Sequence, residues 1–305
     1  MIQGEPTIHK YPGNCHCGSV RFEIHLASPF QTTFACPCSI CAKAGCPWIF
    51  TQDDELKFTK GRDTLASYKT QMGEYEFCAT CGTPITVRNH LTVAGQPGIG
   101  VSARALRDVN PFHLSVTKYA LTYFSHRSVQ LMIELPGLNR RLTPPREDEP
   151  ASSAPEVQPT QQSPKTYTGG CHCGAIHITV TSAPLRDVQV KEDNCSICQR
   201  NANTCIYPTK CAVATQDPSS QLREYRFGRK FTGHRFCGVC GVQLYMHLYG
   251  PPAAVVARLS PEKQELVRRN LEIVPVRVQV LDGVEWEEIH VERSDEGTEG
   301  YVLGA

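Results

Sequence analysis

The segment at residues 36–46, CPCSICAKAGC, concentrates cysteine side chains at a spacing suited to holding one metal ion. Cys36, Cys38 and Cys41 lie within six residues, so a single loop can bring three sulfurs to one point. Three protein thiolates leave the fourth position of a tetrahedral site open, which distinguishes a catalytic zinc site from a structural one. Because zinc favours sulfur and promotes thiol deprotonation, an incoming thiol is the natural fourth ligand.

Two further cysteine pairs flank this segment. One is a C-x-C pair and the other a C-x-x-C pair about sixty residues later, and each runs directly into a glycine that allows a tight turn. Two thiolate pairs brought together fill all four positions of a tetrahedral site, the arrangement of structural zinc. Disulfides or unconnected buried cysteines are the alternative, which a reducing compartment disfavours. The predicted set is Cys15, Cys17, Cys78 and Cys81.

The whole cysteine pattern occurs twice. The equivalent cysteine follows after 156 residues for Cys15, 157 for Cys38 and 159 for Cys81, so few insertions separate the copies. Flanking segments repeat as well, with GNCHCGSVRFEIHL matching GGCHCGAIHITVTS. This period is far too long for a solenoid and indicates duplication of a whole domain. The second structural set is Cys171, Cys173, Cys237 and Cys240.

One histidine lies between the two cysteines of each C-x-C pair. These are His16 in the first copy and His172 in the second. Successive side chains on a strand point to opposite faces, so each histidine would point away from the ligands beside it. We expect both to be bystanders.

The second copy of the middle segment lacks its first cysteine. Aligning EDNCSIC with ACPCSIC places Asp193 where Cys36 stands. An aspartate oxygen can ligate zinc, so a weaker site formed by Asp193, Cys195 and Cys198 is one interpretation. The other is a degenerate copy that has become a partner or lid for the first.

Three cysteines fall outside the paired sets. Cys46 has no counterpart in the repeat, because Asn203 aligns with it, and it either closes the middle site or is a small buried residue. Cys205 and Cys211 are candidates for the missing sulfur of the second copy, although their spacing gives little support.

The elements that must position these residues are mostly strands. Residues 20–26 alternate apolar and polar side chains, as in a half-buried strand, and residues 176–180 repeat the alternation. The segments TPITVRNHLTVAG and VPVRVQVL give further runs typical of strands. Helix is scarce, and SPEKQELVRRN is the best candidate, with Ser260 as N-cap and Pro261 at the first helical position.

Length and composition fit two ordinary globular domains. The chain has 305 residues, 40% hydrophobic and 20% charged, with a formal net charge of +1. This charge gives no electrostatic basis for binding nucleic acid or an anionic membrane, and no run reaches the ~18 apolar residues of a membrane span. The first residues lack the pattern of a secretory signal, so we expect residence in the cytoplasm, with no nucleic-acid or membrane partner.

A proline-rich segment divides the halves. Residues 142–166 contain six prolines and almost no large apolar side chains, so they cannot bury enough surface to offset chain entropy. We predict a disordered linker at 142–166 between a first domain at 11–135 and a second at 166–292, followed by a loose tail at 293–305. A long loop within one domain is the alternative for the linker.

The segments GNCHCGSVRF, CPCSICAK and FCATCGTPI resemble those of the glutathione-dependent formaldehyde-activating enzyme family, which also includes centromere protein V. The resemblance covers most of both domains. It implies two zinc-bearing β-tent domains, with a structural zinc on the outer four cysteines and a second zinc facing substrate on the middle three. It therefore implies two zinc ions in the first domain and one or two in the second.

The family's activity joins formaldehyde to glutathione as S-hydroxymethylglutathione, formally a carbon–sulfur lyase in reverse. Carried over to this sequence, the reactive zinc lies on Cys36, Cys38 and Cys41, with glutathione and a small electrophile as partners. Lys43 is placed to meet a glutathione carboxylate, and Arg200 occupies the matching position; the alternative for both is a solvated surface cation. We expect the two domains to pack as an intramolecular pseudo-dimer.

Two other functions stay open beside this zinc-dependent lyase or synthase. The same site could serve a zinc enzyme that hydrolyses or rearranges another small metabolite, since one fold hosts several chemistries. A non-catalytic zinc module that binds a protein partner is the third hypothesis. A metal position that exchanges with thiols favours the first two, and a closed site of cysteines favours the third.

Overall fold

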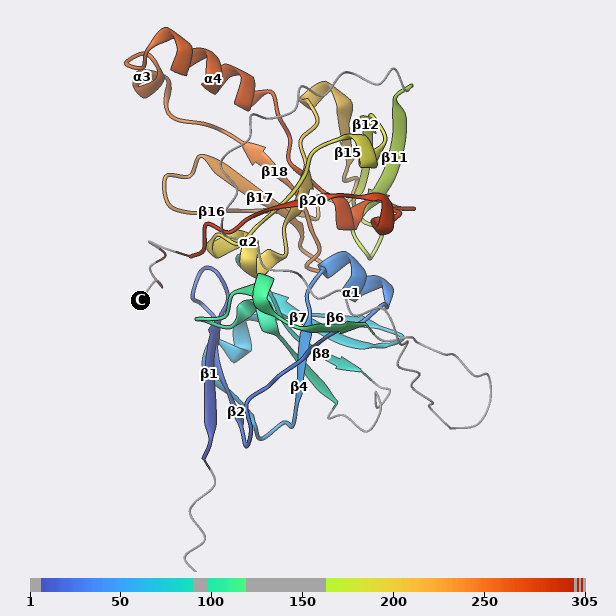
Figure 1. Ribbon diagram of the computed structural model, residues 1–305, viewed down its shortest axis with the longest axis vertical. Coiled ribbons are helices and arrows are strands. Elements are labelled where there is room, and N and C mark those ends of the chain that lie inside the picture. Colours follow the sequence, from blue (N-terminus) through green and yellow to red (C-terminus); the bar gives the residue numbers. More distant parts are fainter. Residues whose placement is uncertain (1–6, 90–97, 119–162, 299–300, 302, 304–305) are drawn as a thin grey trace, which may run out of the picture.

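The computed structural model describes residues 7–89, 98–118, 163–298, 301 and 303. They form two sheet-rich halves that lie one above the other (Figure 1), which confirms the prediction of a mainly β chain with two domains. Most of the predicted linker at 142–166 lies outside the described residues, as does the end of the predicted first domain at 119–135. The last two linker residues, Lys165 and Thr166, already belong to a strand of the second half.

The described residues of the first half form a three-stranded sheet, a seven-stranded sheet and the short α-helix α1. The small sheet has the order β1-β2-β5 and the large one β10-β3-β4-β9-β8-β7-β6. All pairings are antiparallel except that of β10 with β3. The elements are β1 (His9–Asn14), β2 (Arg21–Leu26), β3 (Thr33–Ala35), α1 (Ser39–Ala44), β4 (Trp48–Thr51), β5 (Leu56–Lys60), β6 (Leu65–Thr70), β7 (Gly73–Cys78), β8 (Pro84–Asn89), β9 (Ile99–Ser102) and β10 (Val116–Lys118).

The second half repeats this topology. Its small sheet has the order β11-β12-β15, and its large sheet, β20-β13-β14-β19-β18-β17-β16, follows the same order as its counterpart, including one parallel pair at the same edge. The elements are β11 (Lys165–Gly170), β12 (His177–Ser182), β13 (Val190–Asp193), α2 (Ser196–Asn201), β14 (Thr204–Ile206), β15 (Val213–Gln216), β16 (Leu222–Arg226), β17 (Thr232–Cys237), β18 (Gln243–Leu248), β19 (Val276–Arg277) and β20 (Val291–Ser294).

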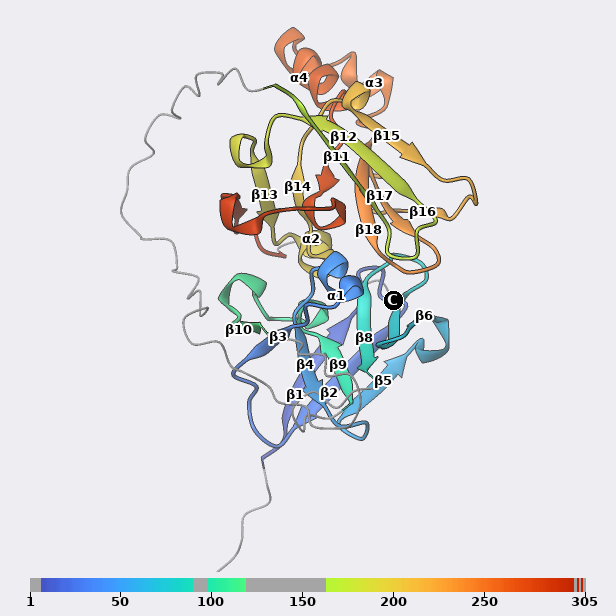
Figure 2. The same cartoon turned by 90° about the vertical axis from the view of Figure 1, so that its right-hand side faces the viewer.

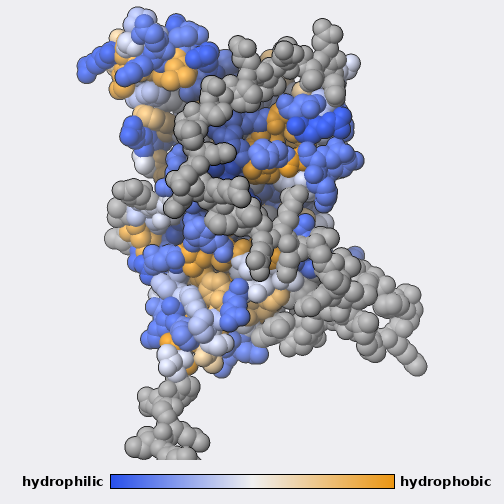
Figure 3. Space-filling view, viewed as in Figure 1, coloured by the Kyte–Doolittle hydropathy of each residue, from blue (hydrophilic) through white to orange (hydrophobic). Residues whose placement is uncertain are grey.

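The predicted helix is present as an arm on the second half. Helix α4 (Pro261–Leu271) follows α3 (Ala253–Val256), and the Ser260 side chain accepts a hydrogen bond from the backbone N–H of Lys263, as an N-cap does. The arm lies at the end of the molecule away from the first half in both views (Figures 1 and 2). None of the α4 side chains is buried, and hydrophobic and hydrophilic residues lie side by side on the arm (Figure 3).

Some described residues of the predicted tail at 293–305 form regular structure or contacts. Val291 to Ser294 form β20, which pairs with β13 and completes the large sheet, so the sheet continues into the segment expected to be a loose tail. The Tyr301 hydroxyl donates to the backbone oxygen of His16 at 2.6 Å and accepts from Asn14 Nδ2 at 3.0 Å. Part of the predicted tail is therefore tied to the first half.

One hydrophobic core is shared by the two halves. It includes Trp48, Tyr75 and Phe77 from the first half and Phe236 from the second, whereas a smaller core belongs almost entirely to the first half. Helices α1 and α2 lie at the junction (Figure 1). No helix in the described part of the chain is long and apolar enough to cross a membrane.

Glycines of the two C-x-x-C-G turns lie in this shared core. Gly82 and Gly241 have φ of +71° and +72°, the left-handed region that favours glycine. A Cβ on Gly82 would lie 2.8 Å from the Phe236 ring, and one on Gly241 would lie 2.5 Å from the Phe77 ring. The same turn of each half thus packs against the equivalent phenylalanine of the other.

Candidate metal centres

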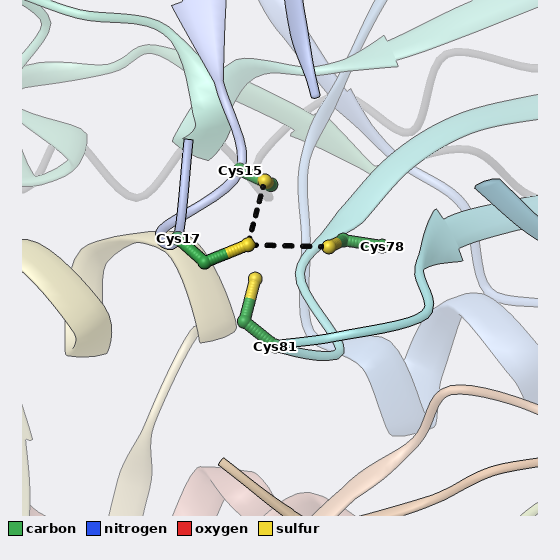
Figure 4. Close-up of side chains that lie close together, drawn as sticks. All are labelled: Cys15, Cys17, Cys78 and Cys81. Atoms are coloured by element: carbon green, nitrogen blue, oxygen red, sulfur yellow. Dashed lines mark hydrogen bonds between the residues drawn. The ribbon is translucent and has the colours of Figure 1, made fainter. Parts of the chain in front are cut away.

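The outer cysteines of the first half converge at the ends of two strands. Cys15 and Cys17 follow β1, Cys78 ends β7, and their Sγ atoms lie with that of Cys81 within 4.8 Å of one another (Figure 4). The Sγ atoms of Cys15 and Cys17 are 3.4 Å apart, and those of Cys17 and Cys78 are 3.6 Å apart. Four sulfurs around one zinc at ~2.3 Å are separated by about 3.8 Å, so the donor set fits a tetrahedral metal ion.

Local hydrogen bonds prepare these sulfurs to carry negative charge. The backbone N–H of Val20 donates to Cys15 Sγ at 3.3 Å, and the Ser19 hydroxyl lies 3.0 Å from Cys17 Sγ and 3.3 Å from Cys78 Sγ. The pKa of Cys17 is lowered to about 6, chiefly by hydrogen bonding from the Cys15 thiol. Hydrogen bonding to Cys17 raises the pKa of Cys15 in turn, so the crowded thiols are unequal in acidity.

The second half repeats the cluster. The Sγ atoms of its four outer cysteines lie within 4.8 Å of one another. Those of Cys171 and Cys173 are 3.5 Å apart, and those of Cys173 and Cys237 are 3.6 Å apart. The N–H of Ile176 donates to Cys171 Sγ at 3.3 Å, as Val20 does to Cys15. The remaining member, Cys240, is fully buried, and this cluster also fits a tetrahedral metal ion.

The middle cysteines of the first half form a set of three. Cys36, Cys38 and Cys41 have their Sγ atoms within 4.8 Å of one another, at the start of α1, where Cys38 is the N-cap residue. Hydrogen bonding from the Cys36 thiol, followed by that from Cys41, lowers the pKa of Cys38 to about 3. The reciprocal interaction raises the pKa of Cys36 to about 11. Among the described residues, no fourth histidine, cysteine or carboxylate joins this set.

The second half carries a mixed set at the same place. A carboxylate oxygen of Asp193 and the Sγ atoms of Cys195 and Cys198 lie within 4.8 Å of one another. Asp193 Oδ1 also accepts the backbone N–H of Cys195 at 2.5 Å. Asn203 Nδ2 donates to Cys198 Sγ at 3.5 Å, a contact that favours the thiolate. The structure therefore brings together the three residues that the alignment of the repeats predicts.

The unpaired cysteines stay outside both sets. Cys46 is buried, and its Sγ lies 3.7 Å from the backbone oxygen of Ala44. Cys46 is therefore a small buried residue and does not close the middle site. Burial raises the pKa of Cys205 to about 12, and exposed Cys211 lies beside the Thr209 hydroxyl. Within the described ranges, neither supplies a sulfur to Asp193, Cys195 and Cys198.

Lys43 and Arg200 lie at the junction of the two halves rather than facing an open site. Lys43 Nζ donates to the backbone oxygens of Gly170 and Val280, both at 3.2 Å, and pairs with Asp282 at 3.4 Å. Arg200 Nε donates to the backbone oxygen of Asn14 at 3.0 Å. The expected contact of Lys43 with a glutathione carboxylate does not match this placement, because α1 faces the second half and its cation is already engaged.

The two histidines bridge the halves. His172 Nε2 lies 2.8 Å from Ser39 Oγ, and its Nδ1 lies 2.9 Å from Tyr68 Oη. Neither histidine joins the metal-binding cluster beside it, as predicted, but each contacts the CSIC segment of the other half. In the first half, His16 Nε2 lies 3.0 Å from Ser196 Oγ and its Nδ1 lies 2.9 Å from Tyr225 Oη.

A signal for this bridge exists in the repeat. Tyr68 and Tyr225 are 157 residues apart, as are Ser39 and Ser196, so the serine and tyrosine partners recur at one spacing. Their link to the histidines depends on how the halves pack, which the spacing alone does not give.

Comparison with known proteins gives a family match that falls on both halves of the chain. The family model described as glutathione-dependent formaldehyde-activating enzyme matches residues 10–119 and 166–269. A crystal structure of a Rhodobacter sphaeroides protein is similar, with 23% sequence identity, over 42% of this chain and 99% of that chain, at a TM-score of 0.32. Because the family match falls once on each half and covers more than half of the sequence, this chain belongs to the glutathione-dependent formaldehyde-activating enzyme family.

Proposed function

We propose that this chain is a zinc-dependent carbon–sulfur lyase or synthase that acts on glutathione adducts, with its reactive site at Cys36, Cys38 and Cys41. The family match supports a glutathione-related role. The observation that carries the proposal is the contrast between two donor sets of one domain. The outer cluster offers four sulfurs, whereas the middle set offers three with no fourth protein ligand in the described ranges.

The reaction requires no oxidant or reductant. In the synthetic direction, the glutathione sulfur forms a bond to the carbonyl carbon of the aldehyde while the carbonyl π bond breaks. The thiol proton ends on the former carbonyl oxygen, which gives the hydroxymethyl thioether. The lyase direction reverses each change. Zinc bound to the middle set would supply a Lewis acid for the incoming thiol at the position that no protein ligand fills.

The protein itself limits how a substrate approaches. Cys41 is 3% exposed and packs in the shared core with Ile40 and Trp48, which exclude water behind the set. Cys36 and Cys38 are both half-buried, so the side of the set that they form is the accessible one. A substrate sulfur would therefore enter from the side of Cys36 and Cys38.

We assign Asp193, Cys195 and Cys198 to a second, weaker metal site. Two thiolates and one carboxylate are acceptable zinc ligands, and the Asn203 amide beside Cys198 is the kind of outer-shell donor that such sites carry. With the two outer clusters as structural sites, the chain would hold two zinc ions in the first domain and up to two in the second.

The packing of the halves supports an intramolecular pseudo-dimer. Equivalent residues exchange equivalent contacts, as with Gly82 on Phe236 and Gly241 on Phe77.

None of the sixteen cysteines is in a disulfide, and clusters of reduced thiols fit a reducing compartment such as the cytoplasm.

The test is formation of the carbon–sulfur bond by the full-length, zinc-loaded chain. We expect glutathione and formaldehyde to combine faster than without protein, as followed by the hydroxymethyl signal in NMR spectra. Cys38→Ser should abolish the acceleration, and Cys195→Ser, the matched change in the second half, should retain most of it. Loss with Cys195→Ser alone would move the reactive site to the second half. No acceleration by the wild-type protein would favour the hypothesis of a non-catalytic zinc module.

A further inference from the structure

A short path of side chains joins two metal centres that belong to different halves. His172 lies in the chain between Cys171 and Cys173, two sulfurs of the outer cluster of the second half. Its Nε2 contacts Ser39 Oγ at 2.8 Å. Ser39 is the first residue of α1 and directly follows Cys38, a member of the middle set of the first half. One imidazole and one hydroxyl therefore separate the two sulfur sets.

The imidazole is held at both ring nitrogens. Tyr68 Oη lies 2.9 Å from Nδ1, and the tyrosine and imidazole rings meet edge to face with centroids 5.4 Å apart. A neutral imidazole donates from one nitrogen and accepts at the other, and hydroxyls such as those of Tyr68 and Ser39 can serve either role. The ring is thus fixed in position by two partners on the first half and by its backbone on the second.

We propose that His172 is a positioning residue of the reactive site, and that it couples the outer cluster of the second half to the middle set of the first half. A metal ion on the outer cluster would fix Cys171 and Cys173, and with them the backbone that carries His172. The imidazole then holds Ser39 at the start of α1, which fixes Cys38. This inference rests on the proposed location of the reactive site and not on its carbon–sulfur chemistry.

The expected loss of metal affinity can be estimated from other metal sites, in which a residue that does not bind the metal orients one of its ligands. Loss of a residue that orients a metal ligand typically lowers metal affinity by about 10- to 100-fold. Coupling between two binding sites is reciprocal, so metal on the middle set would equally tighten the outer cluster of the second half. Neither effect requires His172 to contact a metal ion.

The pseudo-symmetric pair supplies a matched control. His16 makes the same contacts across the junction, to Ser196 and Tyr225, but these lead to the mixed set of the second half. If His172 acts only by holding the halves together, His16→Ala should affect the middle set of the first half as much as His172→Ala does. If it acts through Ser39, only His172→Ala should.

The experiment measures the affinity of the middle set for Co²⁺ in the full chain, by competition with a chelator. The signal of this set is the part of the visible cobalt spectrum that Cys38→Ser removes. We expect His172→Ala to lower this affinity roughly 10- to 100-fold and His16→Ala to change it less than about twofold. Equal effects of the two variants, or no effect of His172→Ala, would overturn the proposal.

Two further variants distinguish an effect through Ser39 from a loss of folding. Ser39 is exposed, so Ser39→Ala should leave the chain folded and still reproduce the weaker cobalt binding of His172→Ala. Combining the two substitutions should add little, because both remove the same contact. Full additivity would contradict a path through Ser39. Since the readout is metal affinity, it stands whether or not the chain joins glutathione to an aldehyde.

Discussion

Arg277 of the second half donates a hydrogen bond from Nη2 to the backbone oxygen of Ala44, the last residue of α1, at 3.0 Å. The same Nη2 donates to the oxygen of Ala202, the C-cap residue of α2, at 3.1 Å, and Nη1 donates to Gln243 O at 3.0 Å. The side chain is fully buried, and burial lowers the pKa of its guanidinium. One cation therefore joins the C-terminal ends of α1 and α2, the helices that contain Cys41 and Cys198.

Replacing this arginine should destabilise the junction. Arg277→Met removes the arginine donor from three buried carbonyl oxygens, of which only that of Ala202 keeps another side-chain amide donor, Gln279 Nε2. We expect the free energy of unfolding to fall by roughly 3–5 kcal/mol. Arg277→Lys keeps the charge but lacks the planar fork, so it should recover only part of this loss. Denaturant titration gives both values.

An exposed arginine provides the comparison. Arg88 pairs with Asp53 at 2.7 Å on the surface, and Arg88→Met should cost less than about 1 kcal/mol. If Arg277→Met cost no more than Arg88→Met, the buried arginine would not stabilise the junction.

The left-handed glycine at the second C-x-x-C-G turn should not tolerate a side chain. Gly241→Ala combines an unfavourable φ with a Cβ 2.5 Å from the Phe77 ring, so we expect a loss of about 3 kcal/mol or more in the free energy of unfolding. Gly283 has a φ of +67° but no atom within 4 Å of its Cβ position. Gly283→Ala should therefore cost only about 1–2 kcal/mol, the backbone part alone. Equal losses would show that contact between the halves at Phe77 contributes nothing.

The outer and middle cysteines should differ in what their loss does to the fold. Cys38→Ser should lower the zinc content by about one ion per chain and leave the β-sheet circular dichroism unchanged. Cys240→Ser removes a buried member of a complete cluster and should unfold much of the second half, since structural zinc contributes directly to folding. Elemental analysis with circular dichroism distinguishes these results. Unfolding by Cys38→Ser would instead make the middle set structural.

Acid should destabilise the second half through His234. This residue on β17 is 4% exposed, and burial lowers its pKa to about 4, so the folded protein holds it neutral near pH 6. The unfolded chain takes up a proton below about pH 6.5, so stability falls as the pH drops from 6.5 to 4 and then levels off. Between pH 7 and pH 5 this amounts to about 2 kcal/mol.

The matched variant for this effect is His234→Gln, which keeps polarity without titrating. The difference in unfolding free energy between the two proteins should grow by about 2 kcal/mol in favour of the variant from pH 7 to pH 5. Any metal lost to acid affects both proteins and cancels in the difference. A constant difference across this range would show that His234 is not held neutral.

Much of the fold and of the candidate sites follows from local sequence. The cysteine spacing indicates the same four groups that the structure assembles, and Ser260 with Pro261 marks the start of α4. Alternation at residues 20–26 predicts a strand because one face of β2 is buried, with Phe22 and Ile24 inside. Each of these features rests on a short motif or on its repetition, although the two cysteine pairs of an outer cluster lie about sixty residues apart in the chain.

The junction could not be predicted in this way. The contacts of His172, Lys43 and Arg277 depend on which face of one half packs against the other. The periodicity of the sequence does not show which faces these are. Lys43 is an example, because an isolated lysine after a cysteine set looks free to meet a ligand carboxylate. Only the packing of α1 against the second half shows that the ammonium group of Lys43 donates hydrogen bonds to two backbone oxygens.

Titration of glutathione into the cobalt-loaded full chain tests the central claim most directly, because cobalt reports its ligands through its visible spectrum. The account predicts a saturable spectral change in the wild-type protein, its loss in Cys38→Ser and its persistence in Cys195→Ser. No change with glutathione, or a change that survives in Cys38→Ser, would contradict a thiol-binding site at Cys36, Cys38 and Cys41.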